Sequence, residues 1–203
     1  MSEKSFEYLK NMSWNDITRD ERFFCQELFS AIRGNERKFV EFLCEHSTKL
    51  TITSKEGQWD SGYEVCFYRD LKFHFNLKKN MKWYSPKRTF DLCLFGEKDI
   101  IVIEAKAEQG FDNKQIKVFQ QDRDRIENAI SAITPPVSNP KVHLVALCSS
   151  YYNPKDDTLK DFDCKITWKD VAGFIPEKKK VFERADSLYP HKEDDSAPGN
   201  TQQ

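Results

Sequence analysis

The sequence lacks the marks of several large functional classes. It contains no GxSxG, Walker A, GxGxxG or HExxH motif, so acyl hydrolases, P-loop enzymes, dinucleotide oxidoreductases and zinc proteases are without their signatures. No apolar run is long enough to cross a membrane, and the N-terminus has no signal-peptide core. The six cysteines include no CxxC pair and no Cys–His pair at zinc-ligand spacing. We therefore expect a cytoplasmic protein with reduced thiols and no membrane association.

A strong charge of one sign is also missing. The net charge is −1, although 32% of the 203 residues are charged and 38% are apolar. Any binding of nucleic acid must therefore come from a local patch of charge. The length suits one domain over residues 1–185, because a chain of this size can build one substantial core. Residues 186–203 are poor in apolar residues and are expected to form a disordered tail.

Residues 89–106 are the most informative stretch. Residues 89–95 and 100–106 are predicted strands, and the second contains the β-branched run Ile-Ile-Val-Ile. Residues 96–99 between them have the length of a hairpin turn. The antiparallel register then pairs 94 with 101, 93 with 102, 92 with 103 and 91 with 104.

This register places two carboxylates together. Asp91 lies opposite Glu104, with Cβ atoms about 5 Å apart, and strand alternation puts Lys106 on the same face. Facing carboxylates repel each other unless a cation lies between them, and Mg²⁺ suits that role because it binds carboxylate oxygens and keeps waters. The alternative is a surface hairpin whose charges face solvent.

Asp91, twelve intervening residues and then Glu104-Ala105-Lys106 together resemble the PD-(D/E)xK nuclease superfamily. Phe90 stands where the superfamily name has proline. The resemblance extends more loosely from about Thr18 to Ile175. It implies the restriction-endonuclease-like α/β fold, a mixed central β-sheet with helices on both faces.

The resemblance also implies a set of roles. Asp91 and Glu104 would hold one or two Mg²⁺ or Mn²⁺ ions, and the carbonyl oxygen of Ala105 would be a further ligand. Lys106 would orient the attacking water, or help to activate it if desolvation lowers the pKa of the amine. Many members carry one more glutamate on the helix before the first strand. Glu21 is the first candidate and Glu27 the second, although Glu21 also stands three residues after Thr18, as in a capping box.

Residues 69–88 form a basic segment with aromatic residues between the charges. Its cations are Arg69, Lys72, Lys78, Lys79, Lys82, Lys87 and Arg88, and its aromatic and histidine residues are Phe73, His74, Phe75, Trp83 and Tyr84. Cations bind phosphates, and aromatic faces stack on unpaired bases, so this segment is the predicted nucleic-acid surface. A solvated loop is the alternative.

Residues 112–133 are a predicted amphipathic helix that begins near Asp112. The resemblance implies a glutamine on this helix near the scissile phosphate. Gln115 is the candidate assigned to the predicted nucleic-acid surface, and Gln120 and Gln121 are alternatives. The acids Asp122, Asp124 and Glu127 suggest ordinary surface pairs with their basic neighbours.

Other segments complete the expected fold. Helices are predicted within residues 1–12, at 18–33, at 35–46 and from 169 toward 184. Strands are predicted at 63–69, 141–150 and 165–168, with a further short strand considered at 50–53. The strand at 141–150 would run parallel to the one at 100–106 through a helical crossover. Its His143 is expected in the core or at an edge.

The favoured function is a magnesium-dependent nuclease that hydrolyses phosphodiester bonds in DNA. The alternative is a non-catalytic module of the same fold that binds nucleic acid or protein. Hydrolysis of RNA or of a small nucleotide at the same site stays open, as does the choice between endonuclease and exonuclease. Cutting of both strands would favour a homodimer, although no sequence feature shows an interface.

Overall fold

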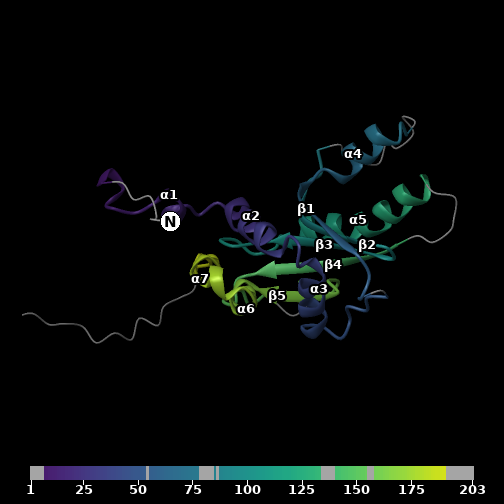
Figure 1. Ribbon diagram of the computed structural model, residues 1–203. Helices are drawn as coiled ribbons and strands as arrows, with labels where there is room; N and C mark the ends of the chain where they lie inside the picture. The colour runs from purple at the N-terminus through teal and green to yellow at the C-terminus, as the bar shows by residue number, and fades with distance from the viewer. Residues whose placement is uncertain are drawn as a thin grey trace, which may run out of the picture.

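The computed structural model arranges the chain around a central β-sheet with helices on both of its faces (Figure 1). It describes residues 7–53, 55–77, 85, 87–133, 140–154 and 158–190. Among these residues, no helix combines the length and the apolar character needed to cross a lipid bilayer.

The five strands lie in the sheet in their order along the chain. They are β1 (Trp59–Val65), β2 (Phe90–Gly96), β3 (Asp99–Ala105), β4 (Lys141–Cys148) and β5 (Cys164–Thr167). β2 pairs antiparallel with both β1 and β3, whereas β4 pairs parallel with both β3 and β5. The sheet is therefore mixed, which confirms the predicted α/β class.

Seven α-helices and two short 3-10 helices lie in the described part of the chain. The α-helices are α1 (Trp14–Ile17), α2 (Glu21–Ile32), α3 (Glu36–Glu45), α4 (Phe67–His74), α5 (Asn113–Ser131), α6 (Trp168–Phe174) and α7 (Lys179–Ser187). The 3-10 helices are η1 (Glu7–Leu9) and η2 (Pro176–Lys178).

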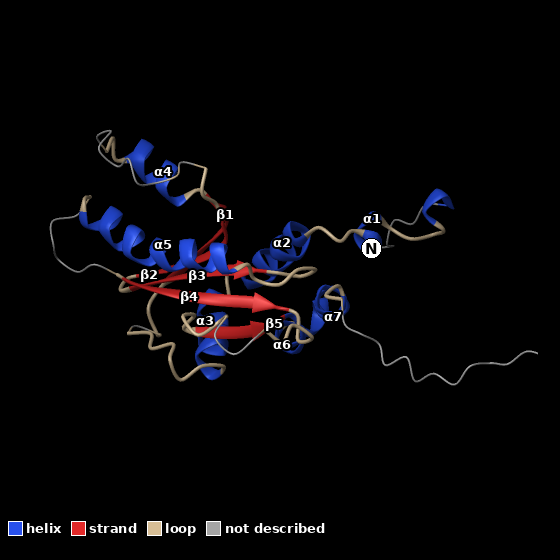
Figure 2. Ribbon diagram, turned by 180° about the vertical axis from the view of Figure 1, so that it is seen from behind, coloured by secondary structure: helices blue, strands red, loops and turns tan. Residues whose placement is uncertain are grey.

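Two hydrophobic clusters bury the two faces of the sheet. One face of the β2–β3 hairpin packs with α2, α3, α6 and α7 through Leu92, Leu94, Ile101, Ile103 and Ala105. The other face packs with α4 and α5 through Cys93, Ile100 and Val102. In Figure 2, α5 lies along one side of the strands, and α3 and α6 lie on the opposite side. β3 is buried along its whole length, so the alternative of a solvent-facing hairpin is wrong.

The predicted hairpin register is confirmed for three of its four pairs. Leu92 pairs with Ile103, Cys93 with Val102 and Leu94 with Ile101. The pairing continues one step further toward the turn, where Phe95 lies opposite Ile100. The turn itself is shorter than predicted, because Gly96 and Asp99 belong to the strands. Asp91 and Glu104 occupy the positions immediately beyond the last of these pairs.

The prediction for the first strand is confirmed at residues 63–65 and wrong at 67–69. β1 ends at Val65, and the residues that follow form α4 instead of continuing the strand. Glu64 takes a left-handed backbone conformation with φ of 50°, which ends the regular extension of the strand. The neighbours Phe67 and Tyr68 are both buried, which a helix allows and a strand with one covered face does not.

Several other predictions can be compared with the structure. α5 begins after Asp112, whose carboxylate accepts a hydrogen bond from the Lys114 N–H, and it leads into the parallel strand β4 as predicted. Residues 50–53 form no strand. The tail was predicted from residue 186, but α7 includes Asp186 and Ser187, and residues 191–203 lie outside the described part.

The cysteines agree with the expectation of reduced thiols. All six are free of disulfides, and four of them are buried. These four pack in the two cores as small apolar side chains.

Candidate active site

The site begins with the contact between Asp91 on β2 and the end of β3. Asp91 Oδ2 accepts a hydrogen bond of 2.8 Å from the backbone N–H of Ala105. This bond ties the first carboxylate to the strand that carries the second, because Ala105 directly follows Glu104. The strand pairing thus brings the two acids to the same end of the hairpin.

Lys106 lies among these acids. Its Nζ donates to Ala105 O at 2.8 Å, to Glu21 Oε1 at 3.2 Å and to Glu104 Oε1 at 3.3 Å. Its backbone is also held on both sides, since its N–H donates to Leu147 O at 2.8 Å and its C=O accepts from Trp168 Nε1 at 3.1 Å. The predicted placement of Lys106 beside Glu104 is confirmed, and α6 adds a support that the sequence did not indicate.

The structure distinguishes between the two candidate glutamates on α2. Glu21 reaches the site, where Oε2 accepts a hydrogen bond of 3.0 Å from the Ala107 N–H in addition to the contact with Lys106. Glu27 instead pairs with Lys178. The capping box with Thr18 was wrong, because the helix begins after Asp20, whose side chain accepts from the Arg22 N–H.

The electrostatics of the site reflect crowding of buried acids. Burial, followed by repulsion from Asp91, raises the pKa of Glu104. Burial also raises the pKa of Glu21, against the opposing effect of Lys106. Burial alone would lower the pKa of Lys106, but the nearby Glu104, Glu21 and Asp91 outweigh it and the pKa is raised. Lys106 is therefore an ammonium ion in this arrangement, and the alternative of a desolvated, neutral amine is not supported.

Arg88 is largely buried, whereas the sequence predicted it on an exposed basic surface. It belongs to the predicted basic surface, but its side chain is only 23% exposed and forms ion pairs inside the molecule. Its Nη2 lies 3.5 Å from Glu104 Oε2, and its Nε donates to Asp122 Oδ2 at 2.9 Å. Arg88 is thus a second cation beside the acids of the hairpin.

Asp122 is the residue that sequence reasoning missed. The sequence predicts an ordinary surface acid here, but the Asp122 side chain is only 1% exposed. It lies on the buried side of α5, with Phe119 and Ile126 one turn away on either side. A charged residue within that apolar stripe was the available signal, because a carboxylate at such a position needs a buried partner.

Much of the basic segment falls outside the described residues. This holds for Lys78, Lys79 and Lys82, whereas Lys87 is described and exposed. Arg69 pairs with Asp70 at 2.8 Å. On α4, Phe73 is 81% exposed and Phe75 just beyond the helix is 47% exposed. Figure 1 shows α4 projecting from the sheet on the side of α5.

The three candidate glutamines of α5 lie in different surroundings. Gln115 lines a cleft of about 260 Å³ together with Arg19, Glu21, Lys106, Glu108 and Gln109. Gln120 donates to Asp161, and Gln121 accepts from Arg125. Of the three, Gln115 is the one that shares a cleft with Lys106.

The oxygen atoms of Asp91, Glu104 and Ala105 are the possible ligands of a divalent cation. Within the described ranges, no group of three or more His, Cys, Asp or Glu side chains could hold a metal ion. Mg²⁺, however, is commonly bound by one or two carboxylates and completes its shell with water and substrate phosphate. Glu104 Oε2 is buried and has no hydrogen-bond partner in the described part of the protein. A buried carboxylate oxygen without a hydrogen bond, on the residue directly before the Ala105 N–H that Asp91 contacts, fits one such ion.

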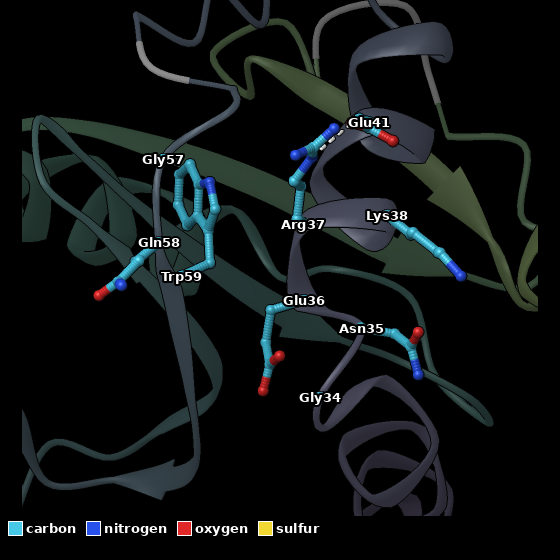
Figure 3. Close-up of a pocket in the computed structure, with 9 residues that line it drawn as sticks. All are labelled: Gly34, Asn35, Glu36, Arg37, Lys38, Glu41, Gly57, Gln58 and Trp59. Atoms are coloured by element: carbon cyan, nitrogen blue, oxygen red, sulfur yellow. Dashed lines mark hydrogen bonds and ion pairs between the residues drawn. The ribbon is translucent and has the colours of Figure 1, made fainter.

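A larger cavity of about 530 Å³ lies at the other end of the hairpin, between the start of α3 and β1 (Figure 3). Trp59 from β1 faces Arg37 of α3 across it. Trp59 pairs with Gly96 at the turn end of β2, far along the strand from Asp91. Arg37 pairs with Glu41 at 3.0 Å, so its charge is already balanced. This cavity contains none of the predicted site residues.

Comparisons with known proteins do not add to this description. No protein-family model matches the sequence, and no curated protein matches it.

Proposed function

We propose that this protein is a metal-dependent nuclease with the restriction-endonuclease-like fold, and that its substrate is DNA. The observation that supports this most is the convergence of Asp91, Glu104, Lys106 and Glu21 at one end of the β2–β3 hairpin. The four charged groups come from two strands, the residue after β3 and the start of a helix. Two carboxylates contact one ammonium, and a third is bonded to the neighbouring Ala105 N–H, which makes a site suited to a cation and a phosphate.

Asp91 and Glu104 would hold a Mg²⁺ or Mn²⁺ ion, with the Ala105 carbonyl as a further oxygen ligand. Such an ion lowers the pKa of bound water and stabilises charge on a phosphoryl group. In hydrolysis, the oxygen of water bonds to phosphorus, the bond to one ester oxygen breaks, and that oxygen leaves with a proton. No covalent intermediate with the protein is required.

Lys106 would position the attacking water and offset negative charge on the phosphate. Its three donors already contact three different oxygens, so it can exchange one of these contacts for water or substrate. Glu21 holds both the Lys106 ammonium and the Ala107 N–H, and it would keep the lysine in this orientation. Gln115 and Lys87 would contact the nucleic acid beside the cleft.

Cleavage of plasmid and single-stranded DNA by the purified protein, with Mg²⁺ or Mn²⁺ present, tests this proposal. Activity should require the metal and should be lost in Asp91→Ala and in Lys106→Ala. Glu27→Gln is the matched control, because Glu27 lies on the same helix as Glu21 but pairs with Lys178. Activity that survives Asp91→Ala unchanged would refute the assigned roles.

A second candidate is a binding module without cleavage activity. It is favoured by the two cations, because Lys106 and Arg88 already offset Glu104 without any metal. Calorimetric titration with Mn²⁺ separates the two candidates. A nuclease binds the ion and loses this binding in Glu104→Gln, whereas a module of this kind binds no ion at the hairpin.

A further inference from the structure

Arg88 is held more rigidly than a surface arginine that binds a nucleic-acid backbone. Its guanidinium carbon lies 4.9 Å from the centre of the Phe90 ring and 5.7 Å from that of Phe119. Its Nε donates to Asp122 Oδ2 at 2.9 Å. The two rings and the carboxylate together restrict the orientation of the guanidinium plane.

Asp122 is held in turn by the helix on the same side of the sheet. Tyr68 of α4 donates its hydroxyl to Asp122 Oδ1 at 2.7 Å, and Arg125 Nη1 lies 3.6 Å from the same oxygen. Burial and the adjacent Asp122 both raise the pKa of Tyr68, so this hydroxyl stays a donor. A buried carboxylate is costly unless it is paired and hydrogen-bonded, and this one has both kinds of partner.

The remaining side of the guanidinium faces the acids of the hairpin. Nη2 lies 3.5 Å from Glu104 Oε2, which is too long for a hydrogen bond. Glu104 Oε2 has no hydrogen-bond partner among the described residues. Arg88 is therefore anchored through Nε, and its Nη2 is directed toward Glu104 Oε2, the acid that would ligate the metal ion.

We propose that Arg88 is a further catalytic residue, which binds a non-bridging oxygen of the scissile phosphate, and that Asp122 and Tyr68 are its positioning residues. This rests on the proposed nuclease function. A planar guanidinium with one edge fixed to a carboxylate presents its remaining N–H groups to a phosphate with little further ordering. A phosphodiester entering a site with three carboxylates needs such a cation in addition to Lys106.

The test compares Arg88→Ala and Arg88→Lys with the wild-type protein in steady-state DNA cleavage. We expect Arg88→Ala to lower kcat about 100-fold, the size typical of losing one preorganised donor to a transition state, with a much smaller change in KM. Guanidinium ion at millimolar concentration should restore part of this activity. Binding of Mn²⁺, measured by calorimetry, should persist. Arg37→Ala is the control, because Arg37 is also paired with an acid but lies at the opposite end of the hairpin.

Asp122→Asn tests the positioning role. The amide keeps the shape of the side chain but loses its charge, so kcat should fall less than in Arg88→Ala. The double variant should be no slower than Arg88→Ala alone, because both changes remove the same function. Tyr68→Phe should give the smallest loss. Additive losses in the double variant would contradict the positioning role.

The outcomes separate the two proposals. If the wild-type protein cleaves no nucleic acid with either metal, the nuclease function fails and this assignment fails with it. If the wild type cleaves DNA and Arg88→Ala does so at the same rate, only the assignment of Arg88 is refuted. If Arg88→Ala is unfolded, the folded Arg88→Lys variant decides the question. A kcat equal to that of the wild type refutes the role of the Arg88 guanidinium. A much lower kcat supports that role.

Discussion

Two buried polar clusters lie at opposite ends of β3, and they differ in how completely their carboxylate oxygens are paired. At the turn end, Asp99 uses both carboxylate oxygens: Oδ1 contacts His143 Nε2 at 2.8 Å, and Oδ2 accepts from the Thr53 N–H at 2.9 Å. At the other end, Glu104 has one oxygen without a hydrogen bond and a pKa that is raised by burial and by Asp91. The first cluster joins a loop to two strands, whereas the second keeps acids together at a cost in stability.

The unpaired carboxylate oxygen distinguishes the candidate functional cluster. At the turn end both Asp99 oxygens are paired, and the buried atom without a hydrogen-bond partner among the described residues is the imidazole nitrogen His143 Nδ1. Buried polar groups normally find partners, and an unsatisfied one needs an explanation. Functional sites are where proteins tolerate such conflicts, because the missing partner is a substrate or an ion. Substitutions in each cluster therefore show whether its residues contribute to stability or to cleavage.

The largest expected effect is on cleavage in Lys106→Ala. Loss of the ammonium removes the cation that contacts both Glu104 and Glu21, so we expect cleavage to fall about 1,000-fold. A plasmid-nicking assay measures the change, and circular dichroism checks that the variant is folded. A folded Lys106→Ala protein that cleaves DNA at the normal rate would contradict the role of this cluster.

At the turn end, Asp99→Ala should affect stability instead. The change leaves the Thr53 N–H and His143 without their buried partner, so the free energy of unfolding should fall by about 2–3 kcal/mol. Urea unfolding measures it. Cleavage per folded molecule should stay normal, because Asp99 lies at the far end of β3. A loss of cleavage in fully folded Asp99→Ala protein would remove the distinction between the two clusters.

A smaller loss is expected from Glu21→Gln. The amide oxygen can still accept from the Ala107 N–H, but its attraction for the Lys106 ammonium is weaker. Changes in groups that orient a site residue typically cost 10–100-fold, and we expect about 10-fold here. Glu27→Gln is the paired control on the same helix. Equal cleavage by the two variants would show that Glu21 has no role in the site.

The smallest effect is a gain in stability from Glu104→Gln. The raised pKa means that folded Glu104 holds its proton more tightly than the unfolded chain does. Its contribution to stability is therefore present below the ordinary glutamate pKa and is lost as the pH rises through the raised value. Replacing the charge should raise the free energy of unfolding at pH 7.5 by about 0.5–1 kcal/mol, the size of a cross-strand charge pair. Thermal unfolding at pH 7.5 and at pH 4 measures this, and the gain should shrink at the lower pH. A loss of stability at pH 7.5 would contradict the raised pKa.

The core of the candidate site could be predicted because its information is local. Turn length and strand alternation determine which residues of a hairpin face each other, so Asp91, Glu104 and Lys106 could be grouped from the sequence. The same alternation predicts the buried apolar face of the hairpin, formed by Leu92, Leu94, Ile101, Ile103 and Ala105.

The rest depends on contacts between segments distant in the chain. Arg88 and Asp122 meet only because α5 packs across the sheet, and no local pattern joins them. The helical face that Glu21 shares with Phe24 and Leu28 favours it over Glu27 from the sequence, but its contacts with Lys106 and the Ala107 N–H depend on how α2 lies against the residues after β3. The first strand was misplaced because the alternating residues after Glu64 also fit a short amphipathic helix, and packing of Phe67 and Tyr68 decided for the helix.

The central claim is that the cluster at Asp91 and Glu104 is a cation site, and a crystal soaked in Mn²⁺ tests it most directly. We predict an anomalous difference peak about 2.0–2.2 Å from oxygens of both carboxylates, close to the distances usual for small divalent cations. Saturating Mn²⁺ with no peak at these oxygens, and with Lys106 and Arg88 still paired to Glu104, would contradict the claim.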